Sequence, residues 1–231
     1  MALTKLFPSE PSFNEDNDQE LLQPSVDNLP RNYTFKKGLR VVIRNATRGD
    51  IPRLYALMSE TSSKSRGFSP SEFLTVNVFE LISLNGNYCL LVEELGSGKL
   101  VGYTAFGDHC WFMRTRIAKI GESAIVISEE FQGSDISQEL LPLLACLQRE
   151  LGCEGILNDT LLSNYRRFRT SFTNDAGGMF LGMIPREGYR DGSGWEDGLL
   201  MYVSLERYAG KTFSAILDEN EAKFSHNSSK L

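Results

Sequence analysis

Apolar residues along the chain recur at two spacings, one typical of strands and the other of helices. Runs rich in Val, Ile, Leu and Tyr predict strands, and these runs cover 39–44, 88–93, 100–106, 124–128, about 155–160 and 199–203. Apolar residues three or four positions apart predict helices. The predicted helices are one that follows Thr47–Asp50, one at about 71–82 and one at about 136–151. The chain is therefore expected to combine strands and helices in one mixed fold.

The two ends of the chain differ from its middle. Residues 1–38 are polar and acidic and are interrupted by prolines, so they bury little apolar surface and are predicted to form a flexible leader. Residues 39–206 carry the predicted strands and helices and are expected to form one domain, because a chain of 231 residues suits one core with extra segments. Residues 207–231 are a C-terminal extension.

Composition and charge narrow the classes of partner. The chain has 24 basic and 30 acidic residues and a net charge of −6, whereas nucleic-acid binding requires a basic surface, so no nucleic-acid partner is expected. No apolar run approaches the roughly 18 residues that a membrane helix needs, so no membrane partner is expected either. The 4 cysteines and 2 histidines lack the spacing of a zinc site. No metal is therefore expected, and the cysteines are predicted to be reduced thiols in the core.

The last three residues carry a localisation signal. Ser229, Lys230 and Leu231 form the tripeptide that directs proteins to the peroxisome when it is free at the carboxyl terminus. The preceding residues 225–228 are polar and would leave the tripeptide accessible. The sequence therefore predicts a peroxisomal protein, with the cytoplasm as the alternative.

The segment 129–137 carries the most informative chemistry, because it joins a predicted strand to a long predicted helix. A short loop that leads into a helix exposes several unpaired backbone N–H groups at the positive end of the helix dipole. Such a helix entrance binds phosphate groups, and small residues such as Gly133 allow the phosphates to approach the backbone. The sequence predicts a pyrophosphate site here.

This loop resembles the acyl-CoA loop of the Gcn5-related N-acetyltransferases, whose pattern is Gln/Arg-x-x-Gly-x-Gly/Ala. Gln132 and Gly133 match its start, whereas Asp135 and Ser137 stand at the two glycine positions. The resemblance extends from about residue 39 to 205. It includes the segment Arg44-Asn45-Ala46-Thr47-x-x-Asp50, the hairpin from 91 to 103, and the closing segment around 180–197.

The resemblance implies a fold and a cofactor. The fold is a mixed, mostly antiparallel central sheet of about six to seven strands, flanked by helices and containing a splayed strand pair. Acetyl-CoA would be the co-substrate. The residues implied to bind it are Ile125, Val126, Ile127, Gln132, Gly133, Ser134, Asp135, Ile136, Ser137 and Asn164.

The resemblance also implies direct attack of a primary amine on the acetyl thioester. Glu122, on the strand before the loop, is the implied general base. Ser171 stands where the family often has a tyrosine as general acid, so Tyr165 or Tyr189 is the candidate for that role. The acceptor would be a small amine, such as a polyamine or an amino acid. A homodimer is one assembly that the sequence leaves open. The alternative function is a non-catalytic module of the same fold that binds CoA or a partner protein.

Overall fold

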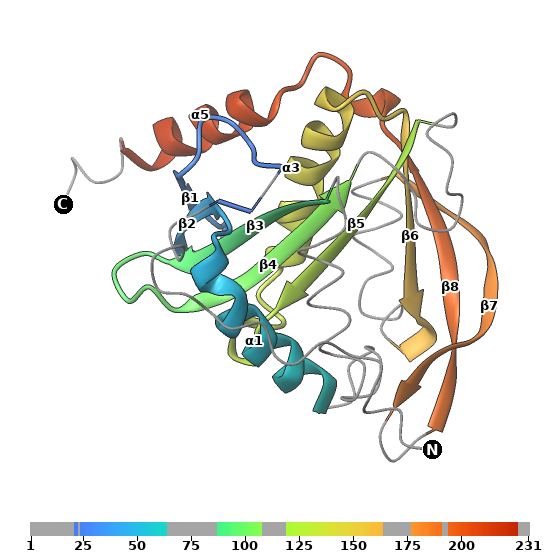
Figure 1. The fold of residues 1–231 in the computed structure, drawn as a ribbon. Helices are drawn as coiled ribbons and strands as arrows, with labels where there is room; N and C mark the ends of the chain where they lie inside the picture. The colour runs from blue at the N-terminus through green and yellow to red at the C-terminus, as the bar shows by residue number, and fades with distance from the viewer. Residues whose placement is uncertain are drawn as a thin grey trace.

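The computed structural model describes residues 21–22, 24–63, 87–107, 119–163, 177–190 and 194–225. Its centre is one sheet of 8 strands in the order β1-β2-β3-β4-β5-β6-β8-β7 (Figure 1). The strands are β1 (Arg31–Thr34), β2 (Arg40–Asn45), β3 (Asn87–Glu94), β4 (Leu100–Gly107), β5 (Ile120–Ile127), β6 (Gly155–Leu161), β7 (Gly178–Arg190) and β8 (Gly194–Ser204). The helices are α1 (Ile51–Ser63), α3 (Ile136–Glu150) and α5 (Phe213–Ser225), with short 3₁₀ turns η3 (Arg48–Asp50), η6 (Glu129–Phe131) and η8 (Glu206–Tyr208).

The sheet is mostly antiparallel, as predicted. Among the eight described strands, β5 and β6 alone pair in parallel, and every other neighbouring pair is antiparallel. A parallel pair needs a crossover connection, and α3 supplies it between β5 and β6. The predicted strands and the helices that follow Thr47–Asp50 and begin at Ile136 are confirmed, whereas the helix predicted at about 71–82 lies outside the described residues.

The sheet has two strands more than the pattern of apolar residues predicts. β1 is only 4 residues long and follows Pro30, so its pattern is too short to be read from the sequence. β7 contains Gly182, Pro185 and Gly188, and its pairing with β8 shifts register at two points. Glycine and proline are depleted in regular strands, which is why this segment was not predicted to be one.

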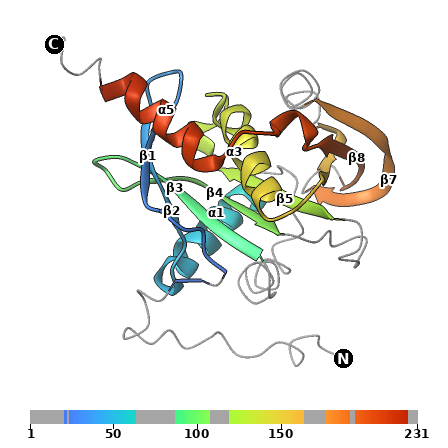
Figure 2. The same cartoon turned by 90° about the horizontal axis from the view of Figure 1, so that it is seen from above.

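Helices cover both faces of the sheet. Figure 2 shows α1 on one side and α3 with α5 on the other. On the α1 side, Leu54, Leu57 and Met58 pack against Leu91 and Val126. The α3 side holds the larger apolar cluster, in which both faces of the buried helix α3 contribute. The two cores together bury β3 and β4 and pack against the end of β5, which gives the central strands a rigid setting.

The prediction of a flexible leader that ends at residue 38 is wrong for its last part. β1 lies within that segment and pairs with β2, and α5 from the C-terminal extension packs on β1. Arg31 forms ion pairs with Asp218 at 2.5 Å and with Glu221 at 2.9 Å. The side-chain amide of Asn220 bonds to both the N–H and the C=O of Thr34. The two ends of the described chain are thus tied to each other at this edge of the sheet, and residues 1–20 lie outside the description.

Cys89, Cys146 and Cys153 are buried free thiols, as predicted, and Cys110 lies outside the description. No described helix combines the length and the apolar character needed to cross a membrane. At the β7 edge, Met179, Phe180 and Met183 are more than half exposed, and the homodimer remains a prediction.

Candidate active site

The site begins where β5 and β6 separate. They pair only between Ile120–Glu122 and Gly155–Leu157, although β5 continues to Ile127 and β6 to Leu161. Figure 1 shows the two strands moving apart toward their carboxyl ends. At the point of separation, the side-chain oxygen of Asn158 accepts bonds from the N–H and hydroxyl of Ser123, at 3.3 and 3.2 Å. Beyond it, the backbone of β5 on this side has no strand partner among the described residues, so this is the predicted splayed pair.

Glu122 is the last residue of β5 that pairs with β6, so it lies where the two strands begin to separate. The preceding residue, Gly121, faces α3, because a Cβ there would come within 2.8 Å of the Gln148 amide nitrogen. Neighbouring residues of a strand point to opposite faces, so the half-buried Glu122 side chain lies on the α1 face. Gln148, which is fully buried, donates to the Glu122 carbonyl at 2.7 Å and fixes the backbone at this point.

The loop after β5 forms a cradle of backbone donors. Gly133 and Asp135 have φ angles of 77° and 64°, which turn the chain sharply before α3. The Gln132 side chain donates to the Ile127 carbonyl at 3.0 Å, and the Ser134 hydroxyl donates to the Phe131 carbonyl. Within the part of the chain that the structure describes, none of the backbone N–H groups of residues 133–137 donates a hydrogen bond. These groups stand at the N-terminal end of a 15-residue helix, where an anionic group is favoured.

Asp135 does not cap the helix. It occupies the N-cap position in the left-handed conformation, but its side chain makes no capping hydrogen bond. Instead its carboxylate forms an ion pair with Lys37 at 2.8 Å. The negative charge that replaces a family glycine is therefore turned toward a cation.

The structure brings together most of the predicted site residues. Glu122 and the segments 125–127 and 132–137 lie along one path, from the closed end of the splay to the start of α3. Asn164 and Tyr165 lie outside the described residues, as do the side chain of Tyr189 and the residues 108–118, so their roles remain predictions.

Two residues at the site are not among those that the sequence predicts. Asn158 is a buried polar residue of β6, but its neighbours Asp159 and Thr160 are also polar, so the sequence does not single it out. Lys37 belongs to a lysine pair followed by a glycine, which is typical of a turn, but only the fold shows that this turn reaches the loop after β5.

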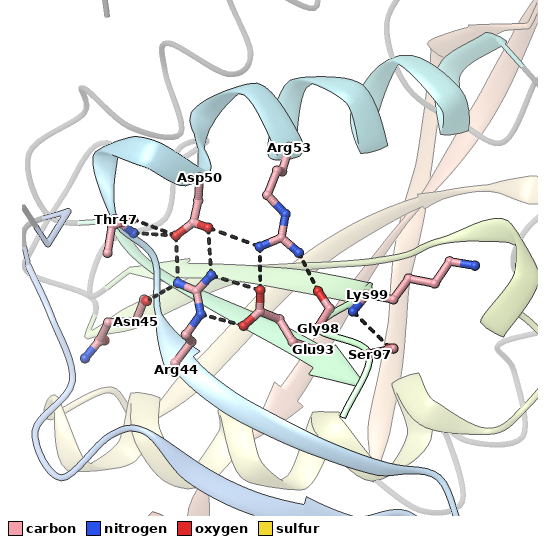
Figure 3. Close-up of polar contacts among 9 residues, drawn as sticks. All are labelled: Arg44, Asn45, Thr47, Asp50, Arg53, Glu93, Ser97, Gly98 and Lys99. Carbon is pink, nitrogen blue, oxygen red and sulfur yellow. Dashed lines mark hydrogen bonds and ion pairs between the residues drawn. The ribbon is translucent and has the colours of Figure 1, made fainter. Parts of the chain in front are cut away.

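An ion-pair network fixes α1 to the sheet beside this path (Figure 3). Arg44 bonds to both oxygens of Asp50, each at 2.7 Å, and to Glu93 at 2.6 and 2.9 Å. Arg53 adds a bond to Glu93 at 2.5 Å and one to the Gly98 carbonyl at 2.9 Å. The backbone N–H of Thr47 donates to the Asp50 carboxylate at 2.8 Å, so the start of the helical segment belongs to this network as well.

The network also sets the pKa values of its two carboxyls. Burial alone would raise the pKa of Asp50, but hydrogen bonds from Arg44 and Thr47 outweigh it, so the pKa is lowered. Burial would likewise raise the pKa of Glu93, but hydrogen bonds from Arg44 and Arg53 outweigh this effect, so the pKa of Glu93 is lowered too. Both groups are therefore held in the charged form.

A pocket of about 600 Å³ opens on the α1 side between α1, the start of β4 and the residues after β5. Its lining includes Glu60, Glu129 and Glu130, and its cations Arg53 and Lys99 are engaged by Glu93 and Glu130. The lining thus holds three carboxylates and two cations, a small excess of negative charge.

Comparison with known proteins identifies the fold. No protein-family model matches the sequence, and no curated protein matches it significantly. Among solved structures, spermidine N-acetyltransferase from Vibrio cholerae, in complex with CoA and spermine, matches with a TM-score of 0.55 at 18% identity. That match covers 73% of this chain and 97% of the other.

Two further structures agree with the first. The protein yncA from Salmonella typhimurium, with its cofactor acetyl-CoA, has a TM-score of 0.58 at 21% identity, over 74% of this chain and 96% of the other. A GCN5-related N-acetyltransferase from Kribbella flavida has a TM-score of 0.59 at 12% identity, over 71% and 97%. The chain therefore has the fold of the Gcn5-related N-acetyltransferases, as the sequence predicted. Its cradle and splayed strands lie where the resemblance places the acyl-CoA site.

Proposed function

We propose that this protein is an acyl-CoA-dependent N-acetyltransferase that transfers an acetyl group from acetyl-CoA to a primary amine of a small molecule. The observation that carries the proposal is the adjacency of two features along β5. Among the described residues, the backbone of β5 beyond Ser123 has no strand partner on the side of β6, and the loop after β5 carries the unpaired amides of residues 133–137. A ligand with an anionic end and an extended, amide-containing arm suits this arrangement.

The residues present fit CoA. The N–H groups of 133–137 would hold the diphosphate, because they are preorganised donors at the positive end of α3. The edge of β5 beyond Ser123, whose N–H is already bonded to Asn158, would pair with the amides of pantetheine as a strand would. The thioester would then lie near Glu122, at the closed end of the splay.

The reaction follows from this placement. The nitrogen lone pair of a neutral amine attacks the thioester carbonyl carbon, the C–S bond breaks, and the CoA sulfur leaves with a proton. Before the attack, Glu122 would accept a proton from the ammonium form of the acceptor, directly or through water, since its side chain lies on the face opposite α3. The proton that the sulfur takes is the one that the nitrogen loses as the amide forms. Residues 133–137, at the other end of the path, would bind the diphosphate and take no part in the proton transfer.

The acceptor class is a small cationic amine, with polyamines and amino acids as the candidates. The net charge of −6 and the small excess of carboxylates in the lining beside α1 both favour a cation over an anion. The V. cholerae enzyme of the same fold was solved with spermine. The alternative function is a non-catalytic module that binds CoA without transferring the acetyl group, and the experiment below distinguishes the two.

We expect CoA and acetyl-CoA to raise the melting temperature of the purified protein. A ligand at 100 times its Kd stabilises the folded state by about 2.7 kcal/mol, which corresponds to a shift of several degrees in a chain of this size. Release of free thiol from acetyl-CoA on addition of an amine would then show transfer. Adenosine, which lacks the diphosphate and pantetheine, is the control and should cause no shift. If CoA at millimolar concentration leaves the melting temperature unchanged, the proposal is wrong; a shift without thiol release over a panel of amines would favour the non-catalytic module.

We also propose that the protein is directed to the peroxisome by Ser229-Lys230-Leu231. The test is imaging of the chain with a fluorescent protein fused at its amino terminus, beside a variant that lacks Leu231. The intact chain should accumulate in peroxisomes and the variant should be cytosolic. Equal distributions of the two proteins would contradict this localisation.

A further inference from the structure

The hairpin between β1 and β2 contacts the start of α3. The turn is closed by bonds from Phe35 N–H to the Leu39 carbonyl, at 2.9 Å, and from Gly38 N–H to the Phe35 carbonyl, at 2.8 Å. The backbone N–H of Lys36 donates to the Glu139 carboxylate at 3.0 Å. This contact places the turn beside the first turn of α3, although about 100 residues of sequence separate the two.

Lys37 reaches farther, into the cradle itself. Its ammonium lies 2.8 Å from the Asp135 carboxylate and 3.3 Å from the Gly133 carbonyl oxygen. Both partners belong to the segment whose backbone N–H groups are unpaired. The side chains of Lys37 and Asp135 are 56% and 48% exposed, so both remain accessible to a ligand.

The electrostatics of the cradle depend on this hairpin. Asp135 and Glu139 place two carboxylates at the end of α3 that would receive a diphosphate, and like charges repel an anionic ligand. The hairpin engages both of them, Glu139 through the Lys36 N–H and Asp135 through the Lys37 ammonium. An ammonium has three donor hydrogens and no acceptor, so Lys37 can remain bonded to Asp135 and still donate to another oxygen.

We propose that Lys37 is a CoA-binding residue, held by Asp135 so that its ammonium contacts a phosphate oxygen of the nucleotide bound at residues 133–137. The inference rests on the proposed function, because it assigns a contact to the same ligand. It also explains how the cradle accommodates an acidic residue at a position where the family has glycine. Asp135 positions the lysine, and the pair adds no net charge to the site.

Calorimetric titration of CoA into Lys37→Ala and Lys36→Ala provides the matched test. Each variant removes one positive charge from the same turn, and the Lys36 side chain makes no ion pair among the described residues. Loss of a charge-assisted bond to phosphate is expected to weaken CoA binding by about 10-fold in Lys37→Ala. Lys36→Ala is expected to change it by less than about 2-fold, and Lys37→Arg to keep most of the affinity.

A second ligand separates the phosphate contact from a general loss of the site. Pantetheine carries no phosphate, so Lys37→Ala should bind it as the wild type does. The fold should persist, because ion pairs this exposed contribute about 1 kcal/mol or less, and circular dichroism checks it. Equal CoA affinity of Lys37→Ala and wild type would overturn the inference and leave the proposed function intact. Equal losses in Lys36→Ala and Lys37→Ala would also overturn it, in favour of a general charge effect. If the wild type itself fails to bind CoA, the proposed function fails and this inference with it.

Discussion

Replacing Glu122 with glutamine is expected to slow acetyl transfer by about 100-fold to 10,000-fold, the range usual for loss of a general base. Glutamine keeps the size and hydrogen-bonding shape of the side chain but accepts no proton at neutral pH. The Glu122 backbone is held by Gln148 and by pairing with Gly107 and Leu157, none of which the substitution touches. CoA binding, measured by calorimetry, should therefore be unchanged while the rate of thiol release falls.

The pH profile distinguishes a base from a merely structural residue. Loss of the base should remove most of the rise in rate with pH, because the reaction then depends on amine that is already neutral in solution. Glu154→Gln is the matched control, since Glu154 is an exposed partner of Lys119 at the start of β6. The control should retain wild-type activity. Full activity in Glu122→Gln would exclude Glu122 as the base.

Replacing Arg44 with methionine is expected to destabilise the fold by about 3–5 kcal/mol. The substitution leaves the carboxylates of Asp50 and Glu93 without their main partner, and their side chains are only 6% and 14% exposed. Because this network connects β2, β3 and α1, its loss also loosens the α1 face on which Glu122 lies. Urea denaturation of the two proteins measures the difference in free energy of unfolding.

The same network predicts that the free energy of unfolding decreases at acidic pH. The pKa values of Asp50 and Glu93 lie below their ordinary values of 3.8 and 4.5, so the unfolded chain binds more protons than the folded one in acid. Their contribution is complete above those ordinary values and is lost as the pH falls through the lowered ones. Arg44→Met should lose less stability on acidification than wild type does.

Two controls test this interpretation. Arg53→Met should cost less than Arg44→Met, since Arg53 is more exposed and Asp50 keeps its partner. The triple variant Arg44→Met, Asp50→Asn, Glu93→Gln should recover part of the lost stability, because it removes the unpaired charges as well. Equal unfolding midpoints for wild type and Arg44→Met would show that the network contributes nothing.

The parts of the fold that repeat a simple pattern could be predicted from the sequence. Buried strands such as β4 and the long helix α3 carry continuous apolar signals. The loop at Gln132 and Gly133 joins β5 to α3, as expected. The phosphate-binding loop could also be predicted, because its donors are backbone N–H groups at the start of a helix, and the local sequence determines where a helix starts.

Contacts between distant segments could not be predicted. The ion pair of Lys37 with Asp135 depends on β1 pairing with β2, and β1 has too few residues to show a strand pattern. Arg44 and Asp50 lie in one short segment that resembles the family, but Glu93 joins them only through the register of β2 with β3. The face on which Glu122 lies likewise follows from Gly121 packing against α3, a tertiary contact.

Amide hydrogen exchange of residues 133–137, followed by NMR with and without saturating CoA, tests the central claim most directly. These N–H groups make no hydrogen bond within the described chain, so they should exchange rapidly in the free protein. With CoA bound they should become strongly protected, while amides in the exposed turn at 96–98 keep their free rates. Unchanged exchange at 133–137 in a sample saturated with CoA would contradict the assignment of this helix entrance as the diphosphate site.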